Sequence, residues 1–204
     1  MNRAVFFDLQ GTLGGDGLDS IMEFSFFPNS IKAIKKVNES ELLAIVLTNQ
    51  GKIAKGHLNY EQYERKLDTI KDELKANDAR FDGVYCCPHE RKDKCECMKP
   101  FPGMAYKAKD DFDLDLKNSY IIGDTGAWDM VLAKNIGCKM VLVKTGLGGS
   151  SLNQYRYSWK DIIPNHIARD VLDGVNWILN LEKRKSNMIK ALDLRYLFDY
   201  KSKE

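Results

Sequence analysis

Five polar residues along the chain have the side chains that phosphoryl transfer requires: Asp8, Thr48, Asn49, Lys99 and Asp124. A carboxylate such as Asp8 can attack phosphorus and form an aspartyl-phosphate. Because the carboxylate and the phosphate are both anions, a cation must bring them together, and Mg²⁺ binds one or two carboxylates plus phosphate oxygens and water. Thr48, Asn49 and Lys99 can hold the remaining phosphoryl oxygens, whose charge rises in the transition state. The set therefore predicts a magnesium-dependent phosphoryl-transfer site.

Each of these residues also has an ordinary structural interpretation when it is taken alone. An Asp that follows a strand is usually a turn or helix-cap residue. Gly-Asp pairs such as Gly123-Asp124 are common in loops, and a single lysine usually lies at the surface. Only the combination of the residues, in this order along the chain, favours a catalytic site.

Short apolar segments alternate with helical patterns and indicate the elements that carry these residues. The segments 3–7, 42–47, 119–122 and 139–143 are typical of buried parallel strands. Helical patterns cover 29–38 (with Asn29 as the expected cap), 60–75, 103–111, 127–136 and 169–181. This order predicts an α/β fold, a Rossmann-like doubly wound parallel sheet. In such sheets ligands bind beyond the carboxyl ends of the strands, where Asp8, Thr48 and Asp124 are expected.

The chain is interpreted as one domain, residues 1–182, followed by a helical tail over 183–204. The tail begins with Lys183-Arg184-Lys185 and carries apolar residues at helical spacing. It is expected to dock on the domain or to fray, with a partner-binding helix as the alternative. The glycine-rich stretch 146–149 is interpreted as a flexible connector, because a phosphate-binding glycine loop needs a helix directly after it.

Four motifs resemble those of the haloacid dehalogenase (HAD) superfamily. Asp8-Leu9-Gln10-Gly11-Thr12 resembles its first motif, D-x-D-G-T, and Gly123-Asp124 with Asp129 resembles its fourth. Thr48 and Lys99 are similar to the second and third. Thr48-Asn49-Gln50 and 53–56 (Ile-Ala-Lys-Gly) are most similar to subfamily IIIA, the branch of the histidinol-phosphate and heptose-1,7-bisphosphate phosphatases.

The resemblance implies a role for each matching residue. Asp8 is then the nucleophile, and Mg²⁺ is held by Asp8, Asp124, Asp129 and the backbone carbonyl of Gln10. Thr48 and Lys99 bind the phosphoryl group, with Asn49 beside them. No segment is long enough to hold the cap domain that many members carry, so an open site is expected.

The chain departs from the family pattern at two positions. Gln10 stands where the family has an Asp that protonates the leaving group and then activates water, and an amide can do neither. Gln10 can still orient a water or the leaving group by hydrogen bonds. A slow phosphatase, a non-catalytic phosphate-binding protein and an engineered trapping substitution all remain open. Met98 stands where the branch usually has an arginine that helps to bind substrate.

Cysteines cluster just before Lys99. Within the loop 86–98, Cys87, His89, Cys95 and Cys97 offer three sulfurs and one imidazole, a closed tetrahedral set that predicts a structural Zn²⁺ site. Reduced thiols or a disulfide formed on oxidation are the alternatives. The related phosphatase branch carries a similar C-x-H and C-x-C pair, which favours zinc. A metal at this loop would fix the position of Lys99.

The composition and net charge of the chain limit the kinds of partner that it is expected to bind. The 204 residues are 44% hydrophobic and 29% charged, with a net charge of +2, which is typical of a globular protein. No apolar run approaches a signal peptide or a membrane helix, so a cytoplasmic location and no membrane contact are expected. The expected partner is a small phosphorylated substrate, such as a sugar phosphate, and the chain is expected to be a monomer or a weak homo-oligomer. A nucleic-acid 3′-end phosphatase is the remaining alternative, which the low net charge disfavours.

Overall fold

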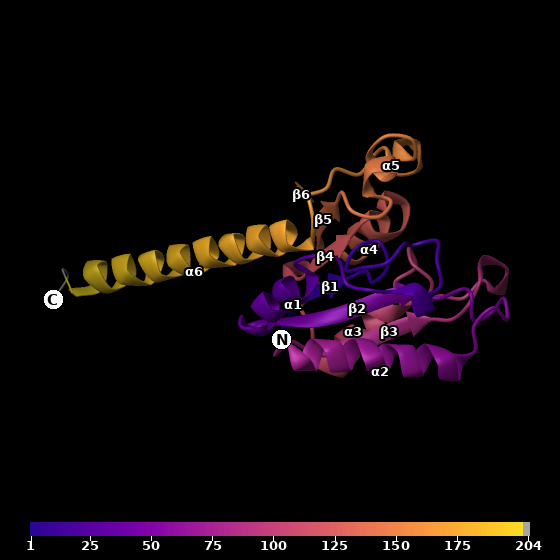
Figure 1. The fold of residues 1–204 in the computed structure, drawn as a ribbon. Helices are drawn as coiled ribbons and strands as arrows, with labels where there is room; N and C mark the ends of the chain where they lie inside the picture. The colour runs from indigo at the N-terminus through magenta and orange to yellow at the C-terminus, as the bar shows by residue number, and fades with distance from the viewer. Residues whose placement is uncertain (202–204) are drawn as a thin grey trace.

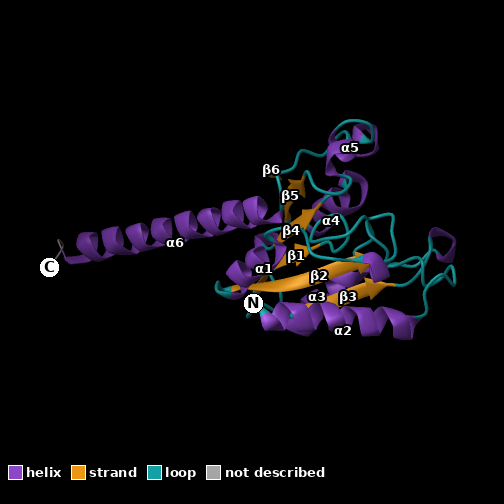
Figure 2. Cartoon of the chain, in the orientation of Figure 1, coloured by secondary structure: helices purple, strands orange, loops and turns teal. Residues whose placement is uncertain are grey.

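The fold was determined as a computed structural model, which describes residues 1–201 and the side chains of residues 1–188. Its strands form one sheet, and all of the strand pairs are parallel. The strands are β1 (Arg3–Phe7), β2 (Leu42–Asn49), β3 (Gly83–Cys87), β4 (Tyr120–Gly123), β5 (Lys139–Val143) and β6 (His166–Ala168). They lie side by side in the order β3-β2-β1-β4-β5-β6 (Figure 2). The predicted doubly wound parallel sheet is confirmed.

Helices cover both faces of this sheet (Figure 1). They are α1 (Ser30–Asn38), α2 (Tyr60–Ala76), α3 (Gly103–Phe112), α4 (Val131–Ile136), α5 (Gly148–Leu152) and α6 (Val171–Lys201). A π-helical turn, Gly126–Met130, leads directly into α4. Short 3₁₀ turns lie at Ile21–Glu23, Arg91–Asp93, Leu116–Asn118 and Arg156–Trp159.

Alternation along β1 divides the core into two layers. Val5 and Phe7 pack with α1, α2 and α6, whereas Phe6 packs with α3 and α4 on the opposite face. All three side chains are fully buried. Successive side chains of a strand point to opposite faces, so a strand with helices on both sides is apolar without interruption. This is why the 3–7 segment is easily recognised as a strand.

Two strands were not predicted as separate elements. β3 is an edge strand whose residues are mostly half-buried, and β6 has only three residues, so neither produces a clear apolar run. The strands predicted at 3–7 and 139–143 have the observed bounds. The strand predicted at 42–47 continues to Asn49, and the one predicted at 119–122 lies one residue later.

The expectation that Asn29 is the cap residue of α1 is confirmed, although its side chain takes no part in the capping. Asn29 occupies the N-cap position, but its φ is 72° and its side chain makes no capping hydrogen bond. Asn is one of the few residues that adopt this left-handed conformation readily. A true capping box instead precedes α2, where Asn59 and Gln62 exchange hydrogen bonds.

The helix predicted at 169–181 does not end at residue 181. α6 runs without a break from Val171 to Lys201 and extends away from the sheet toward the C-terminus (Figure 1). Its base is held by Glu182, which accepts hydrogen bonds from Tyr120 and Arg3. The division of the chain at residue 183 into a domain and a tail stays a prediction. Along residues 1–201, no helix is both long enough and apolar enough to cross a membrane.

Candidate active site

Two of the three acids of the predicted site lie just beyond the ends of neighbouring strands. Asp8 follows β1 and Asp124 follows β4, and these strands pair in parallel. The backbone N–H of Asp8 donates to the carbonyl of Ile122 (3.0 Å), which extends the pairing to the site. The strand order reverses between β1 and β4, and at such a switch point the connecting loops separate and leave a crevice. The fold therefore brings both carboxylates to the place where an α/β sheet binds its ligand.

Lys99 lies buried between two of the acids. Its Nζ is 2.6 Å from Oδ1 of Asp8 and 2.7 Å from Oδ1 of Asp129, and the lysine side chain is only 3% exposed. Burial works to lower the pKa of Lys99, but the charges of Asp129 and Asp8 outweigh it and raise the pKa above its ordinary value. The lysine is therefore a fixed positive charge in the site.

Burial makes the charged forms of the Asp8 and Asp124 carboxyls unfavourable. Burial raises the pKa of Asp8 to about 6, although Lys99 acts in the opposite direction. Burial and the nearby charges of Asp8 and Asp129 raise the pKa of Asp124 well above its ordinary value. One oxygen from each of Asp8, Asp124 and Asp129 lies within 4.8 Å of the others. A divalent cation bound there would offset the repulsion, so the residues fit Mg²⁺.

Backbone from two loops approaches Asp124 closely. A Cβ on Gly11 (φ 85°) would lie 2.2 Å from Oδ2 of Asp124, and one on Gly146 would lie 2.3 Å from the same atom. Leu147 N donates to this oxygen (2.7 Å). The stretch 146–149 is thus a wall of the site, and its interpretation as a mere connector is wrong. Only the folded chain shows this, because the contact is with a residue more than twenty positions away.

Asp129 uses both of its oxygens within the protein. Oδ1 accepts from Lys99, and Oδ2 accepts from the hydroxyl (2.6 Å) and the backbone N–H (3.0 Å) of Thr125. It lies in the π-helical turn Gly126–Met130 that leads into α4. The geometry favours Asp129 as the partner that orients Lys99, while its predicted place among the Mg²⁺ ligands stays a prediction.

The Thr48-Asn49-Gln50 segment ends β2 beside the acids. Thr48 is buried, and its Oγ1 accepts a hydrogen bond from Gln50. Asn49 forms a pair of hydrogen bonds with the main chain of Lys99: its Nδ2 donates to the carbonyl (3.2 Å) and its Oδ1 accepts from the N–H (3.0 Å). Asn49 therefore positions Lys99, in addition to lining the cleft where its predicted phosphate contact would be made.

Two clefts meet at this site. The smaller, of about 40 Å³, is lined by Asp8, Thr48, Lys99 and Asp124 among others. The larger, of about 380 Å³, adjoins it and shares some of its lining. The shared residues are Gln10, Gly17, Leu18, Asn49 and Trp128. The arrangement can hold a phosphoryl group against Asp8 and leave room for the rest of the molecule.

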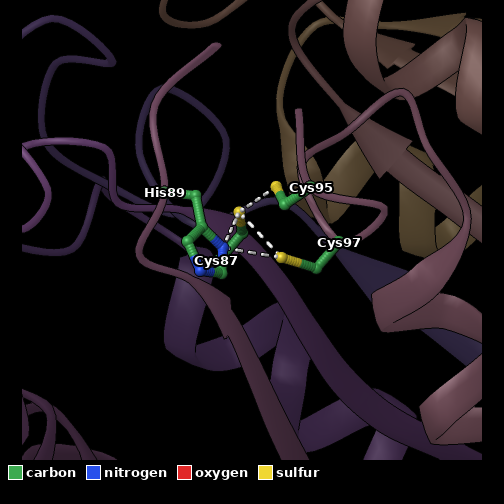
Figure 3. Close-up of side chains that lie close together, drawn as sticks. All are labelled: Cys87, His89, Cys95 and Cys97. Carbon is green, nitrogen blue, oxygen red and sulfur yellow. Dashed lines mark hydrogen bonds between the residues drawn. The ribbon is translucent and has the colours of Figure 1, made fainter. Parts of the chain in front are cut away.

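The four predicted zinc ligands lie together in the loop after β3. Figure 3 shows Cys87, His89, Cys95 and Cys97 pointing toward one another. The Cys87 sulfur lies 3.6 Å from that of Cys95 and 3.1 Å from that of Cys97, and His89 Nδ1 lies 3.1 Å from the Cys97 sulfur. A tetrahedral Zn²⁺ with Zn–S bonds of about 2.3 Å separates its ligand atoms by roughly 3.5–4 Å, so the 3.6 Å pair fits and the two 3.1 Å pairs would open by about half an ångström when zinc binds. The cluster is compatible with zinc, and Cys86 and Cys138 lie outside it.

Sequence reasoning did not assign three further contacts of the site. Thr12 donates to Oδ2 of Asp8 (3.1 Å), and Gln50 and the backbone of Leu147 make the contacts given above. Thr12 and Gln50 belong to the recognised motifs, so a role for them could have been expected. The Leu147 contact uses the backbone alone and leaves no signal in the residue type.

Comparisons with known proteins find relatives of this chain. The HAD-hydrolase-like family model matches residues 96–174. The D-glycero-beta-D-manno-heptose-1,7-bisphosphate 7-phosphatase of Pasteurella multocida is 34% identical over 155 residues, which cover 72% of this chain and 84% of that protein. The enzyme of the same description from Escherichia coli K12 is 35% identical over 154 residues (70% and 80%).

A solved structure is similar over nearly the whole chain. The crystal structure of D,D-heptose 1,7-bisphosphate phosphatase from B. bronchiseptica, complexed with magnesium and phosphate, superimposes with a TM-score of 0.78 at 26% identity. The match covers 87% of this chain and 98% of that one.

Proposed function

Since this chain belongs to the HAD-like hydrolase family, and is therefore a phosphatase that acts on phosphoric monoesters, we propose that Asp8 is its nucleophile and Mg²⁺ its catalytic cofactor. One observation carries the proposal: Asp8, Thr48, Lys99 and Asp124 line a single cleft at the switch point of the sheet. The magnesium in the related crystal structure supports the choice of metal.

Asp8 attacks phosphorus through one carboxylate oxygen, and the bond between phosphorus and the leaving oxygen breaks. Water then attacks the aspartyl-phosphate at phosphorus, which frees Asp8 and inorganic phosphate. Lys99 is fixed against Asp8 and holds a phosphoryl oxygen as negative charge develops. Asp8, Asp124 and the carbonyl of Gln10 would hold Mg²⁺, which when bound supplies the positive charge that lets two anions approach.

Gln10 makes the proposed phosphatase slow. Its amide cannot give a proton to the leaving oxygen or take one from water, so these protons are exchanged with solvent. A general acid–base group typically contributes about 10²–10⁴-fold to the rate. We therefore expect turnover below that of relatives with an acid here, and least for substrates with a poor leaving group.

The substrate is proposed to be a sugar phosphate that carries a second anionic group. In the lining of the larger cleft, three cations (Lys52, Lys55 and Arg91) outnumber two acids (Asp19 and Glu90), and Leu18 and Trp128 add apolar surface. Met98 lies in the same cleft, so these cations can take over the charge that the family's arginine would supply there. The relatives' action on a heptose bisphosphate supports this assignment.

Zinc is proposed as a structural ion at Cys87, His89, Cys95 and Cys97. These residues supply a full tetrahedral set, so no position stays open for catalysis. Cys97 lies two residues before Lys99. Zinc at the loop would hold the main chain of Lys99 from one side, while Asn49 holds it from the other.

The test is phosphate release by the native chain and by Asp8→Asn, with and without Mg²⁺. We expect magnesium-dependent release from a sugar bisphosphate that the Asp8→Asn variant lacks. Lys55→Met should reduce kcat/KM for the bisphosphate more than for the matching monophosphate. Ligand-dependent thermal stabilisation without any turnover would instead identify a phosphate-binding protein.

A further inference from the structure

Both polar atoms of the Gln10 side chain have hydrogen-bond partners within the protein. Its Nε2 donates to the backbone carbonyls of Asp16 (3.0 Å) and Asp19 (3.1 Å). Its Oε1 accepts from Nε2 of Gln50 (2.8 Å). An amide nitrogen has two hydrogens, so both donors of Gln10 are used. Both N–H groups of Gln10 are therefore used to bind the loop that follows it.

The neighbours determine the orientation of this amide. Backbone carbonyls only accept hydrogen bonds, so the NH₂ group of Gln10 must face Asp16 and Asp19. The oxygen then faces Gln50, whose side chain is 4% exposed and also donates to Thr48 (2.9 Å). The result is a chain of hydrogen bonds from Thr48 through Gln50 and Gln10 to the loop.

The loop that Gln10 holds forms part of both clefts. Its two ends are joined by Gly15 N, which donates to the carbonyl of Ser25 (3.0 Å). Between these ends, Gly17 and Leu18 line the small cleft over Asp8 and the larger cleft beside it. Leu18 is 70% exposed, so packing contributes little to holding the tip of the loop in place. Within the turn, Leu18 N donates to Oδ1 of Asp16 (2.9 Å) and Asp19 N donates to the Asp16 carbonyl (3.2 Å). The two hydrogen bonds from Gln10 tie this turn to the loop that carries Asp8.

We propose that Gln10 and Gln50 are positioning residues that hold the 16–19 turn against the clefts and so determine which leaving group the phosphatase accepts. The kinetic part of this proposal rests on the proposed function. A carboxylate at position 10 could not replace the amide, because it would face two carbonyl oxygens with no hydrogen to share. Gln10, which stands where the family has an acid, therefore has a structural role that requires an amide.

The variant that tests this proposal is Gln10→Glu, which keeps the length of the side chain and removes both donors. Gln50→Glu removes the donors to Gln10 and Thr48, and the distant Gln154→Glu is the matched control. Order parameters of the backbone N–H groups of Gly17, Leu18 and Asp19 report the restraint directly. We expect them to fall from about 0.85, typical of ordered backbone, toward 0.6 or below in Gln10→Glu.

Kinetics separate positioning from a general loss of structure. The probes are a sugar 1,7-bisphosphate, which fills the larger cleft, and p-nitrophenyl phosphate, which does not. Loss of the hydrogen bonds should raise the ratio of KM for the bisphosphate to KM for p-nitrophenyl phosphate about tenfold. Equal losses for both substrates would overturn the specificity role, and unchanged order parameters in Gln10→Glu would overturn the restraint.

Gln10→Asp decides between this proposal and a simple missing acid. If the variant gains activity by about 10²-fold or more while the loop stays ordered, Gln10 is only a lost general acid and the proposal fails. If the native chain releases no phosphate at all, the proposed function fails instead. In that case the order parameters and the Kd for the bisphosphate, measured by calorimetry on the native chain and Gln10→Glu, still decide the role of Gln10.

Discussion

Neutralising the proposed nucleophile should stabilise the metal-free protein at neutral pH. Burial raises the pKa of Asp8 from its ordinary 3.8 to about 6. A carboxyl whose pKa is raised by folding contributes stability that is fully present below its unfolded pKa and is lost as the pH rises through the folded value. The charged form of Asp8 should thus cost the native state on the order of 3 kcal/mol above pH 6, at about 1.4 kcal/mol per pKa unit.

Asp8→Asn replaces the carboxyl with a neutral group of nearly the same size. The gain in stability of the variant over the native chain should be about 2.5 kcal/mol larger at pH 7.5 than at pH 4, where Asp8 is protonated in the folded native chain. The assay is urea unfolding at both pH values in buffer freed of Mg²⁺ by an ion-exchange resin, because a soluble chelator would also remove zinc. Asp72→Asn, at an exposed position of α2, is the control.

The second part of this test measures how added Mg²⁺ changes the stability of the native chain and of Asp8→Asn. Added magnesium should stabilise the native chain at pH 7.5 and have much less effect near pH 4, and it should have little effect on Asp8→Asn at either pH. If Asp8→Asn changes the free energy of unfolding equally at both pH values, the charge of Asp8 is not costly in the native state. The argument that this carboxylate awaits a cation would then be refuted.

Three further predictions concern the protonation of Asp8, the charge of Lys99 and the metal content of the cysteine cluster. At low Mg²⁺, kcat/KM should fall as the pH is lowered through about 6, because Asp8 becomes protonated, and more Mg²⁺ should move this fall to lower pH; a pH–rate series at two metal concentrations measures both. Lys99→Met leaves Asp8 and Asp129 facing each other without a cation, so it should abolish phosphate release and destabilise the protein by roughly 3–5 kcal/mol in urea unfolding. The native chain should retain about one zinc after dialysis and Cys95→Ser much less, by elemental analysis; retention below about half an equivalent by the native chain would contradict the four-ligand site.

Local sequence patterns were sufficient to predict most of the strands of the sheet. β1, β2, β4 and β5 are short apolar segments between helices, and burial on both faces of a parallel sheet makes such segments continuous in hydrophobicity. Two strands were not predicted. β3 is a half-buried edge strand, and β6 has only three residues, too few to show a periodic pattern. The helix end at 181 was misplaced since α6 continues without a terminating residue.

For the site, the sequence alone indicated which residues could carry the proposed chemistry. Asp8, Thr48, Lys99 and Asp124 stand at strand ends or beside a metal-ligand cluster, and the order of parallel strands brings such ends to one edge. The contacts that each of these side chains makes could be seen only in the tertiary structure. It placed Lys99 against Asp129, turned Asn49 toward the Lys99 main chain, and committed Gln10 to the 16–19 turn. These roles depend on hydrogen bonds and charges within about 3 Å, between residues that no spacing along the chain relates.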